Sequence, residues 1–361
     1  MFIVTVIMNE TADRPFPQYK RFLPGGTSSW GVMHAFNRTA GGLFLFGPDE
    51  KEHFRSLVFG AAHFCGLEVL TWTCLDNHFH LVLNVPSEAE GARLRAEVSE
   101  EEIFERMKKC YSQAYLKETK QRLKKFRSTP GKEALAESIM RRLRAQMYDI
   151  SKYMHIVQRR FSAWFNERHG RRGTLWQGRF GSTLVEPSGE ALRKTSAYID
   201  LNAVRAGIVK DPKDYRWCGY AEAEAGRADG LAGIVTIVRM ATNSPDSEPI
   251  SGSEALERYR EWLVELGAPV TDENGELVRR GFAAPEGGSK LSQAGQLGTR
   301  IRYFTASLVI GSRAFCEEHF RLHRHAFGPK RQTGARPLRH GNWDGLCGLR
   351  DLRSKVIGAP R

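Results

Sequence analysis

The segment at residues 76–86, DNHFHLVLNVP, sets the strongest constraint on how this chain folds. It is an apolar run in which two histidines, His78 and His80, are separated by Phe79. Side chains on a strand alternate between the two faces of a sheet, so a strand here places both imidazoles on one face and Phe79 on the other. Two neutral imidazoles on a rigid strand supply half of a divalent-metal site. The alternative is a pair of strand histidines with structural contacts only, so a metal site needs a third ligand.

The neighbouring segments predict an α+β fold. We expect strands at 30–39, 67–75, 78–85 and 178–186, with a helix at 48–64 where apolar residues recur every three to four positions. These elements follow one another as strand, helix, strand and strand, with one more strand later in the chain. This order is typical of a ferredoxin-like antiparallel sheet. His34 lies in the first strand. One possibility is that it faces the site, but we expect it to have a core or edge role.

A second polar pair lies in PSGEALRKTSAYIDLNA, residues 187–203, which should form a helix capped by Ser188. Tyr198 and Asn202 are four residues apart and therefore share a helical face, with Lys194 one turn earlier. The apolar positions of this segment mark a different stripe. Tyr198 is then either available for chemistry or an ordinary boundary tyrosine.

Three motifs together resemble a known family. The HFH strand, LWQGRF at 175–180 and YIDLNAVRAGIVKDPKDYRWCGY at 198–220 are similar to the single-tyrosine transposases of the His-hydrophobe-His (HUH) superfamily, and to its REP-associated tyrosine transposase-like group. The resemblance covers about residues 28–86 and 150–220, and it is the joint order and spacing of the motifs that is specific. It implies a ferredoxin-like sheet, cleavage of single-stranded DNA and a covalent 5′-phosphotyrosine intermediate.

The resemblance also implies site roles. His78 and His80 correspond to the metal-binding pair, Tyr198 to the nucleophile, and Asn202 to the third ligand. Relatives commonly have Asn-Pro where this chain has Asn202-Ala203, and we expect that change to alter the end of the helix more than the chemistry.

This chemistry needs a metal and an activated tyrosine. A divalent ion polarises the scissile phosphate, and Mg²⁺ or Mn²⁺ suits phosphate oxygens better than Zn²⁺. The unperturbed pKa of tyrosine is about 10, so a nearby cation such as Lys194 or the metal would favour the phenolate. A phosphotyrosine keeps the energy of the broken bond, so a second 3′-hydroxyl can reverse the step, which suits strand transfer.

The charge of the chain favours a polyanionic partner. The net charge is +13 with a pI near 9.6. Basic clusters occur at 120–127, 141–144, 159–160 and 168–172, and their alternative explanation is solvated helix faces. We expect single-stranded or hairpin DNA as the partner. The candidates for holding it are Lys194, Gln177, Arg179, Arg171, Arg172 and Trp176.

The six cysteines form no Cys-x-x-Cys knuckle and are expected to be reduced thiols. The apolar N-terminal stretch lacks a basic leader, and no run reaches transmembrane length, so we expect a cytoplasmic protein without membrane contact.

We expect a catalytic domain at 28–220 with a helical insertion at about 87–150, and a linker at 221–253. An accessory basic, helical region at 254–361 should follow, and it either binds DNA or forms a flexible basic tail. Apolar positions from Met140 to Trp164 alternate by three and four, which predicts one long helix whose seam packs on the sheet or forms a homodimer. A second His-x-His motif at His323 and His325 lies in a basic segment and is expected to be surface.

The sequence thus predicts a transposase that nicks and joins single-stranded DNA. Two other functions stay open. A non-catalytic protein derived from a transposase would bind structured DNA or RNA without cleaving it. A metal-dependent phosphoesterase would use water, with Tyr198 structural.

Overall fold

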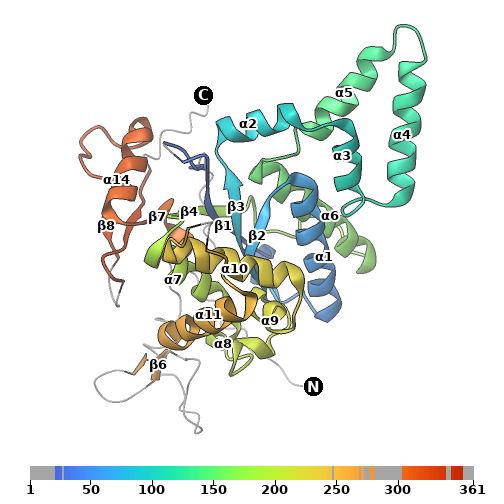
Figure 1. Cartoon of the computed structure of the whole chain (residues 1–361). Helices are drawn as coiled ribbons and strands as arrows, with labels where there is room; N and C mark the ends of the chain where they lie inside the picture. The colour runs from blue at the N-terminus through green and yellow to red at the C-terminus, as the bar shows by residue number, and fades with distance from the viewer. Residues whose placement is uncertain are drawn as a thin grey trace.

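The computed structural model describes the following residues of the 361-residue chain: 21–26, 28–245, 248–267, 270–271, 277–279, 303–338 and 343–352. Across these residues the fold is α+β, as predicted, and is built on a seven-stranded sheet with the order β2-β3-β1-β4-β7-β9-β8 (Figure 1). Its strands are β1 (Trp30–Arg38), β2 (Glu68–Cys74), β3 (His78–Pro86), β4 (Gly181–Val185), β7 (Val309–Gly311), β8 (Arg336–Pro337) and β9 (Cys347–Leu349).

The first four strands have the predicted ferredoxin-like arrangement. β3 pairs antiparallel with both β1 and β2, and β4 pairs antiparallel with the other edge of β1. The two helices of this unit, α1 (Pro48–Cys65) and α6 (Ile150–Arg168), pack against each other on one face of the sheet. Within this unit, only β2 and β3 are neighbours in sequence and form a hairpin. The pairs β1–β3 and β1–β4 join strands that are far apart in the sequence.

Helix α1 shows how local sequence sets an element. Pro48 occupies the first turn, and the Glu50 carboxylate accepts a hydrogen bond from the Gly47 amide at 2.9 Å. The helix ends at Gly66, which has a left-handed φ of 68°, and a Cβ at this position would collide with the Arg106 and Tyr148 side chains. Glycine is required here both for its conformation and for the close approach.

The segment between β3 and α6 forms a projecting helical arm (Figure 1). Its helices are α2 (Glu88–Glu97), α3 (Glu100–Met107), α4 (Gln113–Arg127) and α5 (Glu133–Arg144). The prediction of one long helix from Met140 to Trp164 was wrong, because α5 ends at Arg144 and Tyr148 has a φ of 54° before α6 begins. The seam residues from Met140 to Phe161 are buried in the core of this same chain. They do not form an exposed seam for a second copy.

The other face of the sheet is covered by a second helical layer. It consists of α7 (Gly189–Asp200), α8 (Asn202–Arg205), α9 (Gly219–Glu224), α10 (Ala228–Thr242) and α11 (Gly252–Gly267). Residues 221–253 therefore contain a packed helix where a linker was predicted. Gly233 of α10 lies against the β2 backbone, where a Cβ would come within 2.2 Å of the Leu70 carbonyl oxygen.

The described C-terminal residues complete the sheet. β7 pairs parallel with β4, β9 pairs with β7, and β8 pairs with β9. Helix α14 (Arg313–Leu322) packs against β7 and β9, and the short α13 (Tyr303–Ala306) packs against β4. The accessory helical region predicted at 254–361 thus contributes strands to the main sheet. A separate two-stranded ladder joins β5 (Val270–Thr271) and β6 (Leu277–Arg279).

The structure also bears on two smaller predictions, on membrane-spanning helices and on the second His-x-His motif. Among the described residues, none of the helices combines the length and apolar character needed to cross a membrane. His323 of the second His-x-His motif stacks on Phe22 with ring centroids 3.9 Å apart, and His325 is exposed. The second motif is therefore partly structural and partly surface.

Candidate active site

The histidine pair lies on β3 as its alternation predicts. The rings of His78 and His80 have centroids 5.3 Å apart and are nearly perpendicular, at 86°. Phe79 points to the opposite face, where it is buried against Phe54 and Trp176 with centroids 4.8 and 5.3 Å away. The buried Phe79 fixes the register of the strand, and with it the direction of both imidazoles.

Helix α7 brings Tyr198 to the same face. The Tyr198 ring lies edge-on to His80, with centroids 5.7 Å apart at an interplanar angle of 80°. Its other neighbours are Phe304 of α13, stacked at 4.7 Å, and the Arg205 guanidinium, 5.2 Å from the ring centroid. Residues 118 positions apart in sequence, His80 and Tyr198, are thus in direct ring contact.

The end of α7 departs from the prediction. The helix expected at 187–203 is interrupted at Leu201, whose φ and ψ are −81° and 1°, and a new turn begins at Asn202. The Tyr198 carbonyl accepts a hydrogen bond from the Arg205 side chain at 3.3 Å. The Asn202 side chain is half-buried and makes no hydrogen bond to any of the residues that the structure describes.

A hydrogen-bond relay fixes the tautomer of His80. His34 Nδ1 lies 3.0 Å from the Phe304 carbonyl oxygen, which can only accept, so this nitrogen carries the proton. His34 Nε2 then accepts a hydrogen bond from His80 Nδ1, 2.9 Å away. The neutral His80 ring therefore carries its lone pair on Nε2. His34 was expected to be a core or edge residue, and it is fully buried but hydrogen-bonded directly to the site.

His78 has an equivalent arrangement. Its Nδ1 lies 2.7 Å from the Asn77 side-chain oxygen, so the ring donates there and carries its lone pair on Nε2. Metal-binding histidines typically donate their second ring N–H to an oxygen or another side chain, which orients the ring. Both histidines of β3 fit that pattern.

Burial keeps the imidazoles of His34 and His80 neutral. Desolvation lowers the pKa of His34 to about 3. Desolvation also places the pKa of His80 well below its usual value, with the neighbouring His34 and His78 adding to the shift. Metal binding requires a neutral imidazole, so the burial suits the donor role.

The donor set fits a divalent metal with an incomplete protein shell. In the described ranges, no three His, Cys, Asp or Glu side chains are grouped so as to hold a metal ion. A metal bound by His78 and His80 would take its other ligands from an amide, water or phosphate oxygen. Asn202, which the sequence predicts as the third ligand, makes no side-chain hydrogen bond with the residues that the structure describes.

Two residues expected to hold DNA are structural instead. Trp176 is 6% exposed, packs within the aromatic core and donates its Nε1 hydrogen to the Gln158 carbonyl at 3.2 Å. Lys194 is 5% exposed and ion-paired with Asp344, with Glu190 3.6 Å away. Both proposals for DNA contact at these positions are therefore corrected: the side chains face protein partners.

The remaining candidates lie beside the site or on the surface. Gln177 accepts a hydrogen bond from Arg38, and Arg38 stands directly opposite His78 in the β1–β3 register. Arg179 and Arg172 are exposed, whereas the Arg171 guanidinium lies over Phe165 at 5.6 Å. Sequence reasoning did not single out Arg38. Only the strand register places its charge beside the histidine pair.

Comparison with known proteins adds little to this geometry. No family model matches the chain, and no curated protein matches it significantly. A solved structure described as that of a REP-associated tyrosine transposase bound to a REP hairpin is similar over 58% of this chain and 86% of that one, at 13% identity and a TM-score of 0.35. A similarity of this degree is too low to transfer an activity or a partner, so the function rests on the site itself.

Proposed function

We propose that this protein is a metal-dependent single-stranded DNA endonuclease and strand transferase, a transposase that acts through a 5′-phosphotyrosine. The observation that carries the proposal is the contact of the Tyr198 ring with His80, on the strand that also bears His78. The sequence motifs support the same conclusion, since they resemble the HUH single-tyrosine transposases.

The residues that would hold the metal are His78, His80 and Asn202, through two imidazole nitrogens and an amide oxygen. Mg²⁺ or Mn²⁺ bound there would neutralise charge on the scissile phosphate and its leaving oxygen. The relay from Phe304 through His34 orients His80 for this role, so His34 is a positioning residue.

Tyr198 supplies the nucleophile. Its phenolic oxygen forms a bond to phosphorus while the bond from phosphorus to the 3′ oxygen breaks; the phenolic proton passes to water and the leaving 3′ oxygen takes up a proton. The Arg205 guanidinium, 5.2 Å from the centroid of the Tyr198 ring, places a positive charge beside the nucleophile. In the reverse direction a 3′-hydroxyl attacks the phosphotyrosine and releases Tyr198, which joins the strands.

Positive side chains near the site would hold the strand. Arg38, oriented by Gln177, lies beside His78, and Arg179 is exposed close by in sequence. The net charge of +13 supports single-stranded or hairpin DNA as the partner.

The test is a denaturing gel after the protein is mixed with 5′- or 3′-labelled hairpin oligonucleotides, with Mn²⁺ or with EDTA. We expect a metal-dependent shifted band that carries the label of one strand end only. The oligonucleotides should include the DNA that flanks the protein's own gene.

Two other outcomes identify the competing functions. Cleavage without a shifted band would mean that water is the nucleophile and the protein is a phosphoesterase. Salt-sensitive binding without cleavage would identify a non-catalytic nucleic-acid binder.

A further inference from the structure

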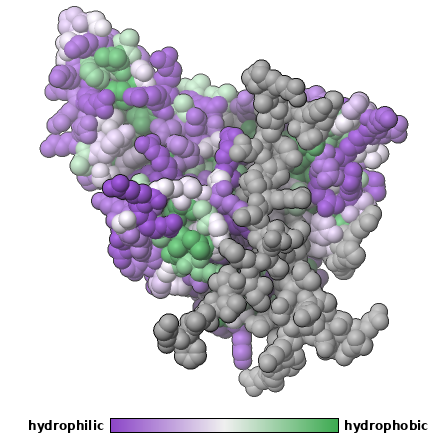
Figure 2. Space-filling model, turned by 180° about the vertical axis from the view of Figure 1, so that it is seen from behind, coloured by the Kyte–Doolittle hydropathy of each residue, from purple (hydrophilic) through white to green (hydrophobic). Residues whose placement is uncertain are grey.

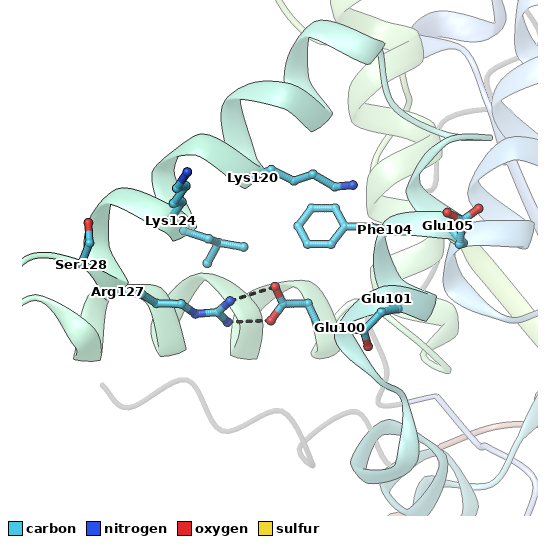
Figure 3. A pocket seen from close by; sticks show the side chains of 9 residues that line it. Glu100, Glu101, Phe104, Glu105, Lys120, Lys124, Arg127 and Ser128 are labelled. Atoms are coloured by element: carbon cyan, nitrogen blue, oxygen red, sulfur yellow. Dashed lines mark hydrogen bonds and ion pairs between the residues drawn. The ribbon is translucent and has the colours of Figure 1, made fainter.

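In the part of the chain that the structure describes, one pocket lies within the helical arm and another, of different charge, lies where the arm meets α6. The first lies between α3 and α4, and Figure 3 shows acids facing bases across it. Arg127 and Glu100 form an ion pair at 2.6 Å there, and Lys120 lies over the Phe104 ring at 4.9 Å. The second pocket, of about 630 Å³, lies where α4, α5 and α6 meet. None of its described lining residues is acidic, and the basic ones are Arg122, Arg142, Arg159, Arg160 and His155.

Helical spacing gathers these side chains into one place. His155 and Arg159 are four residues apart on α6, and Tyr115 and Thr119 are four apart on α4, so each pair shares a face. Other residues of the same helices, among them Leu116 and Leu123 of α4 and Tyr153 and Val157 of α6, are buried in the core. The arm, at the upper left of Figure 2, is mostly hydrophilic on its surface with an apolar patch.

The arginines of this pocket lack acidic partners within it. Arg142 and Arg159 are exposed, and their side chains have neither an ion pair nor a hydrogen bond with any described residue. Arg122 has only an exposed contact with Glu118 at 3.9 Å, which solvent screens. Guanidinium groups that converge without acids form a site for phosphate oxygens, which they bind with charge-assisted hydrogen bonds.

An aromatic platform lies in the same pocket. Tyr111 and Tyr115 stack with centroids 5.1 Å apart at 24°, and Tyr115 remains 43% exposed. Arg160 holds this stack: its guanidinium lies 5.1 Å from the Tyr111 centroid and donates a hydrogen bond to the Cys110 carbonyl. An exposed, rigid tyrosine surrounded by arginines is a suitable surface for an unpaired base and its phosphates.

We propose that the pocket between α4, α5 and α6 binds single-stranded DNA, with an unpaired base on Tyr115 and neighbouring phosphates on Arg142 and Arg159. In a duplex the base faces are stacked on one another and unavailable to Tyr115. The pocket belongs to the layer of α1 and α6, whereas Tyr198 and His80 lie on the opposite face of the sheet. It is therefore a second contact, separate from the catalytic one, and the choice of DNA over RNA rests on the proposed function.

The test is fluorescence anisotropy of the full chain with a labelled oligodeoxythymidylate of about 15 nucleotides in EDTA. We expect the double variant Arg142→Gln with Arg159→Gln to bind about tenfold more weakly. The salt slope should fall by about 1.4, since each phosphate contact of a single strand contributes about 0.7. The matched control is Lys120→Gln with Lys124→Gln, which removes the same charge from the first pocket and should leave the slope near that of the wild type.

A second pair of variants tests the platform. Tyr115→Ala should weaken binding about tenfold, and Tyr115→Trp should preserve it, because stacking needs only an aromatic face. If the arginine and the lysine double variants lost the same amount of binding affinity, the proposal would be overturned, because the DNA would then be attracted by the overall positive charge and not by this pocket. Unchanged binding by Tyr115→Ala, or tighter binding of duplex, RNA or an acidic peptide than of the oligonucleotide, would also overturn it. EDTA prevents metal-dependent cleavage, so this experiment measures binding alone. A negative result would overturn the pocket proposal without affecting the proposed catalytic function. A protein that does not cleave DNA could still show the expected binding.

Discussion

The two faces of the central sheet meet different physical demands. On the α7 face, His34 and His80 are buried, neutral and joined by hydrogen bonds, and Tyr198 packs between His80 and Phe304. On the α6 face, the arm presents exposed arginines and a stacked tyrosine pair around an open pocket. Chemistry needs side chains held rigidly in one geometry, whereas polyanion binding needs charges that remain in water. The comparison teaches that cleavage and binding should be separable by mutation.

The largest expected effect is the loss of the covalent adduct in Tyr198→Phe. Phenylalanine keeps the ring contacts with His80 and Phe304 but has no nucleophilic oxygen. No protein–DNA adduct should appear on a denaturing gel, while oligonucleotide binding in EDTA stays at the wild-type level. A persistent adduct in this variant would show that another residue attacks the phosphate.

The next effect is that of removing a metal ligand. We expect His80→Ala to lower Mn²⁺-dependent cleavage more than about 100-fold, because loss of an outer-shell partner alone typically costs 10- to 100-fold. The measurement is the cleavage rate against Mn²⁺ concentration. His325→Ala is the control, since it alters the exposed histidine of the second His-x-His motif. Equal rates for both variants would contradict a metal role for the β3 pair.

A smaller effect is expected when the relay is broken. His34→Leu leaves His80 Nδ1 without its acceptor, while the Phe304 carbonyl keeps the Thr183 hydroxyl, 3.0 Å away, as a donor. About 1–3 kcal/mol of folding stability should be lost, because one buried donor has no partner. The Mn²⁺ concentration for half-maximal cleavage should rise about 10- to 100-fold.

His34→Gln distinguishes positioning from stability. Its amide can donate to the Phe304 carbonyl and accept from His80, so it should recover much of the metal dependence. If both variants lose only thermal stability and keep the wild-type metal dependence, His34 is structural and not a positioning residue.

The smallest effect on the cleavage rate is expected when the two pocket arginines are changed. Arg142→Gln with Arg159→Gln should leave the cleavage rate at saturating DNA unchanged within about twofold, because the pocket touches no reacting group. The double variant should lower the cleavage rate only at low DNA concentration, where binding limits the rate. A reduced rate at saturation would show that the two faces act together and would break the separation described above.

Local pattern determined several elements of this protein. The alternation of His78, Phe79 and His80 was sufficient to place both imidazoles on one face, because strand geometry has a period of two. Apolar spacing predicted α1, and the order of strands predicted the ferredoxin-like sheet. Composition fixed the net charge that favours a polyanion.

Only the tertiary structure decided the partners of those residues. His34 joined the site because the β1–β3 register sets it diagonal to His80, and the Phe304 carbonyl that orients it comes from 270 residues further along the chain. The burial of Trp176 and Lys194, the break at Leu201 and the strands near the C-terminus depend in the same way on distant contacts. A local pattern carries the direction of a side chain, but its hydrogen-bond partner and its exposure depend on which distant segment packs against it.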